Sequence, residues 1–315
     1  MAKLVAVTGA TGFVGPHLVR ALAARGYRLR LLVRRWSPLP SLAGIELELV
    51  LGDLEDRAAL GALCAGADAV IHAAGAIKAR TTADFMRANR DGTANLSTAA
   101  GAARLILLSS LAAREPDLSP YAASKRAAER AVADRSGPWL AVRAPAVYGP
   151  GDRETLAYFA GVARGLALAP RADGARVSMI HVEDLAQALA GCVEVELDRE
   201  ICEIDDGKAE GYGYPDLAQA AEAALGRTAR TLRVPRPAMA ALGRINAGLN
   251  RLGAPVQILT HGKVREIFHP DWVVRDRKLA AVLAFSPRYG LMEGFRDTVL
   301  WYRRNNWLRQ TRNTV

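Results

Sequence analysis

Three side chains that can transfer or hold a proton lie close together near the middle of the chain. Tyr121 and Lys125 are four residues apart, so they share one face of a helix. Ser119 and Pro120 stand just before them and are typical of a helix N-cap and first turn. Ser110 lies eleven residues before Tyr121, at the end of an apolar run that predicts a strand. One helix start and one strand end can therefore bring a phenol, an ammonium and a hydroxyl together.

These groups suit the donation of a proton to a carbonyl oxygen during hydride transfer. A phenol with its ordinary pKa of about 10 is a poor acid at neutral pH, and a neighbouring ammonium lowers that pKa because it stabilises the phenolate. We therefore predict Tyr121 as the proton donor, Lys125 as the group that tunes it, and Ser110 as the group that orients the substrate oxygen. The alternative is structural: Lys125 pairs with Glu129 on an alanine-rich helix, and Tyr121 is a core residue.

A glycine loop near the start of the chain indicates the source of the hydride. A strand is predicted at 3–8, and glycines follow at positions 9, 12 and 15. The chain there must turn tightly, admit a diphosphate to its backbone and begin a helix close to the sheet, and each task needs a residue without a Cβ. The helix N-terminus offers free N–H groups to the phosphates. The predicted dinucleotide-binding loop consists of Gly9, Thr11, Gly12, Phe13, Val14 and Gly15; an ordinary glycine-rich turn is the alternative.

The end of the second predicted strand, 28–33, bears on which dinucleotide binds. NAD-binding enzymes usually carry an acidic residue there, about 20 residues past the loop, for the ribose 2′-hydroxyl. This chain has Arg34 followed by Arg35 instead. A guanidinium fork fits a 2′-phosphate, so NADP(H) is predicted as the preferred cofactor, with NAD(H) as the alternative. The structural interpretation is a solvated strand end.

Two further strand ends supply candidate residues. Asp53 follows the third predicted strand, where its carboxylate can accept a hydrogen bond from the adenine amino group or cap the next helix. His72 ends the fourth predicted strand, and we interpret it as a packed structural histidine. Small residues after it let the backbone pass close to the cofactor, at Ala73, Ala74 and Gly75.

The order of the predicted elements gives the fold class. Strands are predicted at 3–8, 28–33, 45–51, 68–73, 104–109 and 139–143, and helices between them at about 13–25, 55–65, 81–102 and 120–135. This alternation predicts an α/β Rossmann fold, with a doubly wound parallel sheet covered on both faces.

After Pro145 the predicted pattern becomes mainly helical. Helices are predicted at about 153–165, 182–196, 215–225, 236–252 and 290–304, with short strands near 176–180, 200–204 and 229–233. We therefore expect an NADP-binding domain at 1–150, to which 176–205 add. Residues 151–315 are expected to form a smaller substrate-binding cap that ends in a basic, aromatic helix.

Composition limits the class of protein and its partners. The 315 residues are 50% hydrophobic and 23% charged, which is ordinary globular usage. The formal net charge of +10 favours an anionic partner such as a phosphorylated cofactor, an acidic carrier protein or an anionic membrane face. A general arginine bias explains the charge equally well. No nucleic-acid motif is visible, so nucleic acid is not an expected partner.

The termini and the cysteines indicate a location in the cytoplasm, with peripheral contact at the inner membrane face as an option. The chain begins directly with a strand, which leaves no room for a signal peptide. No apolar run reaches the roughly 18 residues of a membrane span. Cys64, Cys192 and Cys202 are widely spaced and odd in number, which is typical of buried free thiols. No metal site is expected.

Taken together, these residues resemble the extended short-chain dehydrogenase/reductase family. The matching segments run in family order from residue 1 to 190: the glycine loop, Asp53, 72–74, Asn89 with Gly92 and Thr93, 109–110, Tyr121 with Lys125, 143–151 and 181–185. The resemblance implies the roles given above for tyrosine, lysine and serine, and contact of Lys125 with the nicotinamide ribose. It also implies a supporting role for Asn89 and further cofactor contacts at Leu54, Pro145 and Val147. His181 and Asp184 have a structural alternative as a helix start.

Two departures from the family pattern bear on the reaction. Only ten residues separate Ser110 from Tyr121, where nucleotide-sugar epimerases carry a longer insert. Leu111 and Ala112 stand where the sugar dehydratases carry acid and base residues. Both departures favour plain ketone reduction. The short connection also resembles an atypical branch in which some members bind NADPH without catalysis, but the presence of Tyr121 and Lys125 argues for an active enzyme.

The cap sequence indicates the substrate class. On the predicted helix 236–252, apolar residues Leu242, Ile245, Leu249 and Leu252 share one face, and Arg244 and Arg251 the opposite one. Such a helix suits a membrane surface or an access route for lipid, as do the aromatic and cationic residues at 301–304 and 307–309. The alternative is a lid helix packed on its own domain with a solvated basic face.

The region 259–307 also resembles a bacterial subgroup that includes reductases of 3-keto sphingoid bases or 3-ketoceramides. The segments that carry this resemblance are 262–266, 269–272 and 301–303. We therefore expect an NADPH-dependent reductase of a ketone on a long-chain lipid, as a monomer or homodimer. A nucleotide-sugar epimerase or dehydratase with bound NAD(H) and a non-catalytic NADPH-binding subunit or assembly factor are the alternatives.

Overall fold

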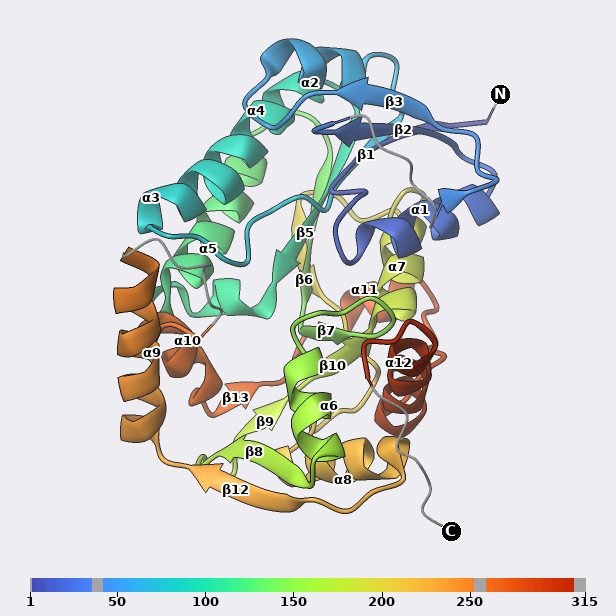
Figure 1. The fold of residues 1–315 in the computed structure, drawn as a ribbon. Coiled ribbons are helices and arrows are strands. Elements are labelled where there is room, and N and C mark those ends of the chain that lie inside the picture. Colours follow the sequence, from blue (N-terminus) through green and yellow to red (C-terminus); the bar gives the residue numbers. More distant parts are fainter. Residues whose placement is uncertain (1, 36–41, 252–258, 309–315) are drawn as a thin grey trace.

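The computed structural model describes residues 2–35, 42–251 and 259–308, without the side chains of 247–251. At its centre lies a parallel sheet in the order β11-β6-β5-β4-β1-β2-β3 (Figure 1). Its strands are β1 (Leu4–Thr8), β2 (Arg28–Val33), β3 (Glu48–Leu51), β4 (Ala69–His72), β5 (Arg104–Ser110), β6 (Trp139–Ala144) and β11 (Glu200–Glu203). The strand order reverses between β1 and β4, which is where ligands bind in open sheets of this type. The predicted α/β Rossmann fold is confirmed.

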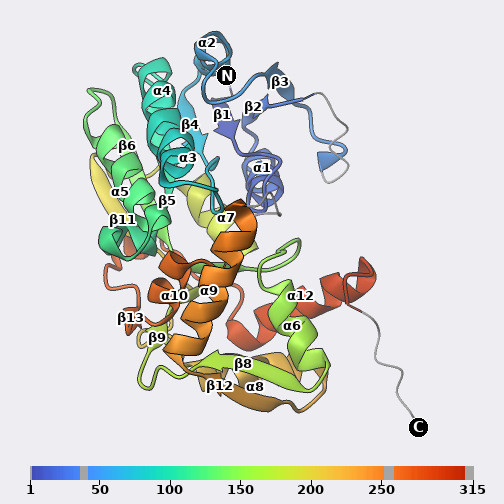
Figure 2. The same cartoon turned by 60° about the vertical axis from the view of Figure 1, so that its left-hand side comes forward.

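Helices cover both faces of the sheet (Figure 2). They are α1 (Gly15–Ala24) and α7 (Val182–Gly191) on one face, and α2 (Arg57–Cys64), α4 (Gly92–Ala99) and α5 (Pro120–Ala133) on the other. Alternate residues of β1 show why both faces need a cover. Val5 and Val7 join the apolar cluster under α1 and α7, whereas Ala6 joins the cluster under α2, α4 and α5. A strand buried on both faces is typical of parallel sheets.

Apart from α7 and β11, which join the sheet and its cover, most of the chain after β6 forms a mainly helical cap below the sheet in Figure 1. Three small parallel pairs join β7 (Ala146–Tyr148) to β10 (Met179–His181), β8 (Leu166–Pro170) to β12 (Arg230–Val234), and β9 (Arg176–Val177) to β13 (Asp271–Trp272). Its helices are α6 (Leu156–Ala163), α8 (Tyr214–Leu225), α9 (Arg236–Arg251), α10 (His261–Ile267) and α12 (Leu291–Arg304), whereas α11 (Lys278–Val282) packs on the sheet through Leu279. None of the described helices is long and apolar enough to cross a bilayer.

The aromatic residues at the C-terminal end pack inside the cap. Tyr302 is fully buried beside Phe159, and Trp301 and Trp307 pack against the same cluster. The prediction that this stretch offers its aromatics to a membrane surface is wrong for Tyr302, which packs inside the cap. Trp301 and Trp307 are only partly buried, so for them it stays a prediction. Arg309 lies outside the described residues.

The helix predicted at 81–102 is divided into three parts. α3 (Thr82–Phe85) leads into a π-helical turn at Met86–Asp91, and α4 follows. A π-helical turn accommodates extra backbone and is frequent at functional sites. It carries Asn89, which is buried. The local helical pattern of the sequence did not indicate this interruption.

The three cysteines are buried and free, as predicted. Burial raises the pKa of each thiol, to about 11 for Cys64 and Cys202 and about 12 for Cys192. A thiol needs its thiolate form to react, so these residues are inert packing groups at neutral pH.

Candidate active site

A cleft of about 1580 Å³ lies where the C-terminal edge of the sheet meets the cap. Its walls come from the glycine loop, the ends of β4, β5 and β6, the first turn of α5 and the cap segment 259–267. The predicted site residues that line it are Gly9, Gly12, Phe13, Val14, Ala73, Ala74, Gly75, Asn89, Ser110, Tyr121, Lys125, Pro145 and Val147. Those outside its lining are Thr11, Gly15, Arg34, Arg35, Asp53 and Leu54.

The glycine loop has the close backbone approaches that the sequence predicted. Gly9 has φ +80°, and a Cβ there would lie 2.5 Å from the backbone nitrogen of Ala74. A Cβ on Gly15 would lie 2.2 Å from the Gly9 carbonyl oxygen. Val14, the N-cap of α1, makes no side-chain cap, so the first N–H groups of α1 are left for another acceptor. This cradle fits the diphosphate of a dinucleotide.

His72 is a structural histidine. It is fully buried, and its Nδ1 and Nε2 atoms lie 2.7 and 3.0 Å from the hydroxyls of Thr8 and Thr93. Burial lowers the pKa of His72 to about 3, so the ring stays neutral. It joins β1 and β4 to α4 beneath the cleft.

Asp53 organises the turn after β3, and a different residue caps the helix. The backbone N–H groups of Glu55 and Asp56 donate to Asp53 Oδ1 at 2.8 and 3.1 Å. The N-cap of α2 is Asp56, whose carboxylate accepts from the Ala59 N–H at 2.9 Å. The suggestion that Asp53 caps this helix is therefore wrong, because the N-cap lies three residues later.

Arg34, Arg35 and Leu54 follow the strands β2 and β3 at the C-terminal edge of the sheet. They lie outside the cleft lining. The Leu54 side chain fills the space beside Gly92, where a Cβ would lie 2.8 Å from Leu54 Cδ1. Arg34 and Arg35 follow β2 directly, and both are exposed. Their guanidinium groups are thus free of the sheet core and accessible from solvent.

Tyr121 and Ser110 meet at the base of the cleft. The Ser119 hydroxyl caps α5 by accepting the Ala122 N–H at 2.9 Å, which fixes the first turn that carries Tyr121. Burial raises the pKa of Tyr121 to about 12, although a hydrogen bond with Ser110 opposes the shift. The negative charge of Glu266 raises the pKa of Tyr121 further.

Lys125 lies one turn beyond Tyr121 and is also buried. Its ammonium donates to the Leu108 carbonyl oxygen at 2.7 Å. Burial lowers the pKa of Lys125 to about 8, and the charge of Glu129 opposes that shift. In this arrangement burial decides the pKa of Tyr121, so the expected lowering by Lys125 is not observed. A pKa of about 12 keeps the phenol protonated at neutral pH and makes it a weaker acid than a free phenol.

Glu129 belongs to a network behind the site. It is 1% exposed and accepts hydrogen bonds from Ser109 at 2.6 Å and from two nitrogens of Arg143 at 2.8 and 2.7 Å. Glu129 forms this bidentate pair with Arg143. It does not form the ion pair with Lys125 along the helix that the structural alternative requires. Lys125 is therefore directed to the end of β5 and the cleft.

Asn89 fastens the wall of the cleft to α5. Its Oδ1 accepts from the Ala76 N–H at 2.7 Å, and its Nδ2 donates to the Ala76 carbonyl at 3.0 Å and to the Ser124 hydroxyl at 2.8 Å. A Cβ on Gly75 would lie 3.0 Å from Asn89 Oδ1. These contacts describe a supporting side chain between two walls of the site.

Two polar residues of α10, Lys263 and Glu266, also line the cleft. Both lie in the segment 262–266 that carries the subgroup resemblance, but neither was predicted as a site residue. Glu266 accepts a short hydrogen bond from Ser119 Oγ and forms an ion pair with Lys263 Nζ at 2.9 Å. No local sequence signal distinguishes them, because only the folded cap brings α10 to the start of α5.

His181 and Asp184 have the structural roles of a helix start. The His181 ring caps α7 by accepting the Glu183 N–H at 3.4 Å. The Asp184 carboxylate accepts the backbone N–H groups of Arg288 and Tyr289, both at 3.0 Å, and so joins the cap to α7.

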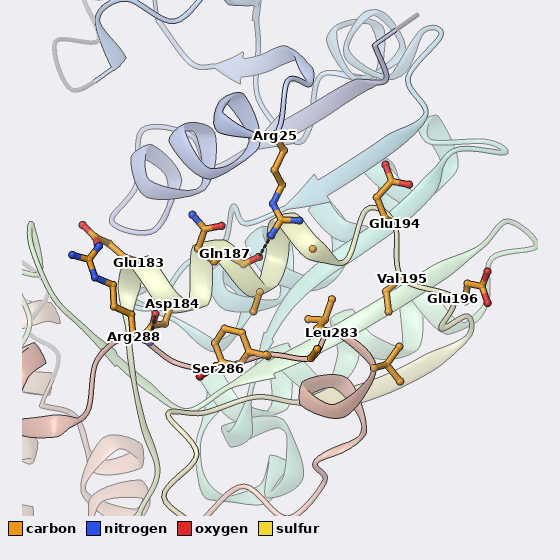
Figure 3. Close-up of a pocket in the computed structure, with 15 residues that line it drawn as sticks. Arg25, Glu183, Asp184, Gln187, Glu194, Val195, Glu196, Leu283, Ser286 and Arg288 are labelled. Atoms are coloured by element: carbon orange, nitrogen blue, oxygen red, sulfur yellow. Dashed lines mark hydrogen bonds between the residues drawn. The ribbon is translucent and has the colours of Figure 1, made fainter.

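A second hollow of about 780 Å³ lies beside α1 and α7 (Figure 3). Charged residues from α7 and the segment 282–288 surround it, and Arg25 donates to the Gln187 carbonyl across it at 3.3 Å. None of the predicted site residues lines it. The chemistry therefore belongs to the larger cleft.

Comparison with known proteins defines the class. The profile of the NAD dependent epimerase/dehydratase family matches residues 5–198. The chain belongs to this family, the extended short-chain dehydrogenase/reductases, and is an NAD(P)-dependent oxidoreductase. It is 44% identical over 307 residues to the ceramide reductase of Caulobacter vibrioides (strain NA1000 / CB15N), which covers 97% of this chain and 96% of that protein.

Solved structures agree with this class at the level of the fold. The crystal structure of gox2253 aligns with a TM-score of 0.78 at 24% identity, over 98% of this chain and 100% of that one. MoeE5 in complex with UDP-glucuronic acid and NAD aligns with a TM-score of 0.71 at 25% identity, over 96% of this chain and 100% of that one.

The glycine cradle can be tested with Gly15→Ala. The new methyl group would lie 2.2 Å from the Gly9 carbonyl oxygen, so the loop must open. We expect the dinucleotide Kd to rise at least about tenfold, or roughly 1.4 kcal/mol, in a fluorescence titration with NADPH. Gly61→Ala, at a helical glycine with open space around it, is the matched control. A folded Gly15→Ala protein that binds as wild type would contradict the cradle.

Proposed function

We propose that the protein reduces a ketone on a long-chain lipid of the sphingoid or ceramide type, with NADPH as reductant. The observation that carries the proposal is the 44% identity to a ceramide reductase along 97% of the chain. The lining of the cleft supports it, because apolar side chains of Phe13, Ile77, Phe85, Leu118 and Ile267 face a space large enough for a lipid segment.

The residues at the base of the cleft can perform the protein's part of this reduction. The nicotinamide supplies a hydride when the cofactor is bound. Tyr121 donates its proton to the carbonyl oxygen, so that ketone, hydride and proton together give the alcohol. Ser110 orients that oxygen, and Lys125 holds the ribose and supports the phenolate left behind. Asn89 supports the site by holding the wall at Ala76 against α5.

NADPH is preferred over NADH in this proposal because of the arginines after β2. Arg34 and Arg35 are exposed and stand where an acidic residue would bind the ribose 2′-hydroxyl of NAD. Their guanidinium groups can pair with a 2′-phosphate in a planar, bidentate manner.

The outer face of α9 supports peripheral contact with an anionic membrane. Leu242 and Ile245 are 48% and 58% exposed, and Arg244 is exposed on another face of the helix. The side of α9 that faces α10 is formed instead by Gly243 and Asn246, whose Nδ2 donates to the Leu259 carbonyl at 3.1 Å. The exposed positions of Leu242 and Ile245 support the membrane contact, while the packing of α9 on α10 and the exposed Arg244 also fit the alternative of a lid helix with a solvated basic face. Leu249, Arg251 and Leu252 were also assigned to faces of this helix, but their side chains lie outside the described part of the structure.

Tyr121→Phe tests the assigned proton donor. We expect kcat for NADPH oxidation with 3-ketoceramide in micelles to fall about 10²- to 10⁴-fold, because the phenyl ring has no proton to give. The Kd for NADPH should stay unchanged. Tyr27→Phe, which removes a hydroxyl bound to Glu194 far from the cleft, is the control. Retained turnover in Tyr121→Phe would exclude this mechanism, and tight NADPH binding without turnover in wild type would favour a non-catalytic role.

The double variant Arg34→Ala/Arg35→Ala tests the cofactor preference. Without the two guanidinium groups we expect KM for NADPH to rise about tenfold, equivalent to roughly 1.4 kcal/mol, while KM for NADH stays the same. Arg28→Ala at the other end of β2, where the side chain pairs with Glu48, should change neither value. Equal changes for both cofactors would refute the 2′-phosphate assignment.

Leu242→Ser/Ile245→Ser tests the membrane contact. We expect the bound fraction in sedimentation with phosphatidylglycerol vesicles to fall severalfold, because each substitution removes apolar area from the contact. Turnover of a water-soluble ketone should be retained. Val282→Ser, at an equally exposed apolar residue on α11, is the control. Unchanged sedimentation of the double variant would contradict this face as the contact.

A further inference from the structure

α10 approaches the catalytic helix more closely than an ordinary side chain allows. A Cβ on Gly262 would lie 2.7 Å from Ser119 Cβ, so the glycine permits the contact. Thr260 caps α10 by accepting the Lys263 N–H at 3.2 Å, which fixes its first turn. The cap therefore presents the polar face of α10 to the first turn of α5, two residues before Tyr121.

The polar face of α10 consists of a buried carboxylate and a partly buried ammonium. Glu266 is 5% exposed, and its carboxylate accepts hydrogen bonds from Ser119 Oγ and from Lys263 Nζ, the latter at 2.9 Å. Its backbone carbonyl also accepts from the Trp272 indole N–H at 2.8 Å, so the α10 backbone is fixed as well. The charge of Glu266 reaches the Tyr121 phenol, whose pKa it raises. Both residues of this pair line the cleft.

The pair has hydrogen-bonding capacity beyond the contacts it makes. A carboxylate offers about four acceptor positions and an ammonium three protons. Within the described part of the chain, the Glu266 carboxylate accepts from Ser119 and Lys263, and the Lys263 ammonium donates to Glu266. The remaining positions belong to groups in the cleft wall, so water or a ligand must satisfy them.

We propose that Lys263 and Glu266 form a specificity site that binds an amide or hydroxyl group of the substrate beside the reacting carbonyl. The inference rests on the proposed ketone reduction and deepens it. A substrate N–H or O–H donates to Glu266, and a substrate carbonyl or hydroxyl oxygen accepts from Lys263. A plain alkyl ketone displaces the water from this pair and offers no replacement, so it binds poorly. The pair thus selects a ketone with polar neighbours over one in a bare hydrocarbon chain.

Two substitutions separate this role from a purely structural one. Glu266→Gln keeps the size of the side chain and an acceptor for Ser119, but it removes the charge. Lys263→Met keeps the length of the side chain and removes its donors. Glu210→Gln, whose side chain is 76% exposed on the surface, is the control.

The experiment compares 3-ketoceramide, which carries an amide and a hydroxyl beside its ketone, with a plain octadecanone in the same micelles. In Glu266→Gln and Lys263→Met we expect kcat/KM for 3-ketoceramide to fall about 10- to 100-fold, mainly through KM. The value for octadecanone should change less than about twofold in Lys263→Met. In Glu266→Gln it should change less than the value for 3-ketoceramide, and any change common to both ketones reports the effect of the lost charge on Tyr121. Equal losses for both ketones would overturn the inference, because they would mean that the pair only holds α5 in position.

Binding of the alcohol product, dihydroceramide, gives a readout that does not need turnover. Tryptophan fluorescence should report a Kd about tenfold higher in both variants than in wild type. An unchanged Kd would overturn the specificity site. Wild type that reduces neither ketone would refute the proposed function, and the dihydroceramide titration would still decide the role of the pair.

Discussion

The parallel direction of every strand pair in the large sheet determines where this protein can do chemistry. Parallel strands end at one edge, so the glycine loop after β1, the small residues after β4 and the serines of β5 meet without any of them being neighbours in sequence. Gly9 packs against the backbone of Ala73 and Ala74 at that edge. The cleft lies between these strand ends and the cap that covers them.

Burial shifts the pKa values of Tyr121 and Lys125, two titratable groups of α5, in opposite directions. It raises the pKa of Tyr121 to about 12 and lowers that of Lys125 to about 8, since the neutral form of each is favoured away from water. The phenol is therefore held in its proton-donating form. Behind Lys125 lies the buried ion pair of Glu129 and Arg143, in which each charge balances the other.

The cap contributes polar groups to a cleft whose other walls are largely apolar. α10 reaches the first turn of α5 through Gly262, and α9 packs on α10 through Gly243, where a Cβ would lie 3.1 Å from the backbone of Thr260. Two glycines thus allow a layered contact from the surface to the reactive tyrosine. The outer layer is apolar on one face, with an arginine on another, and the inner layer carries an ion pair.

Local sequence determined much of this protein and could not determine the rest. The strand–loop–helix at Gly9–Gly15, the helix start at Ser119 and the spacing of Tyr121 and Lys125 depend on neighbours within a few residues, so periodicity and turn chemistry were sufficient to predict them. The division of 81–102 by a π-helical turn, the cap pairs β7–β10 and β8–β12, and the outward face of α9 depend on which surfaces meet in the fold. Glu266 bonds to a serine 147 residues away. The pKa of Tyr121 likewise follows from burial, which exists only once the sheet, α5 and the cap have excluded water from one space.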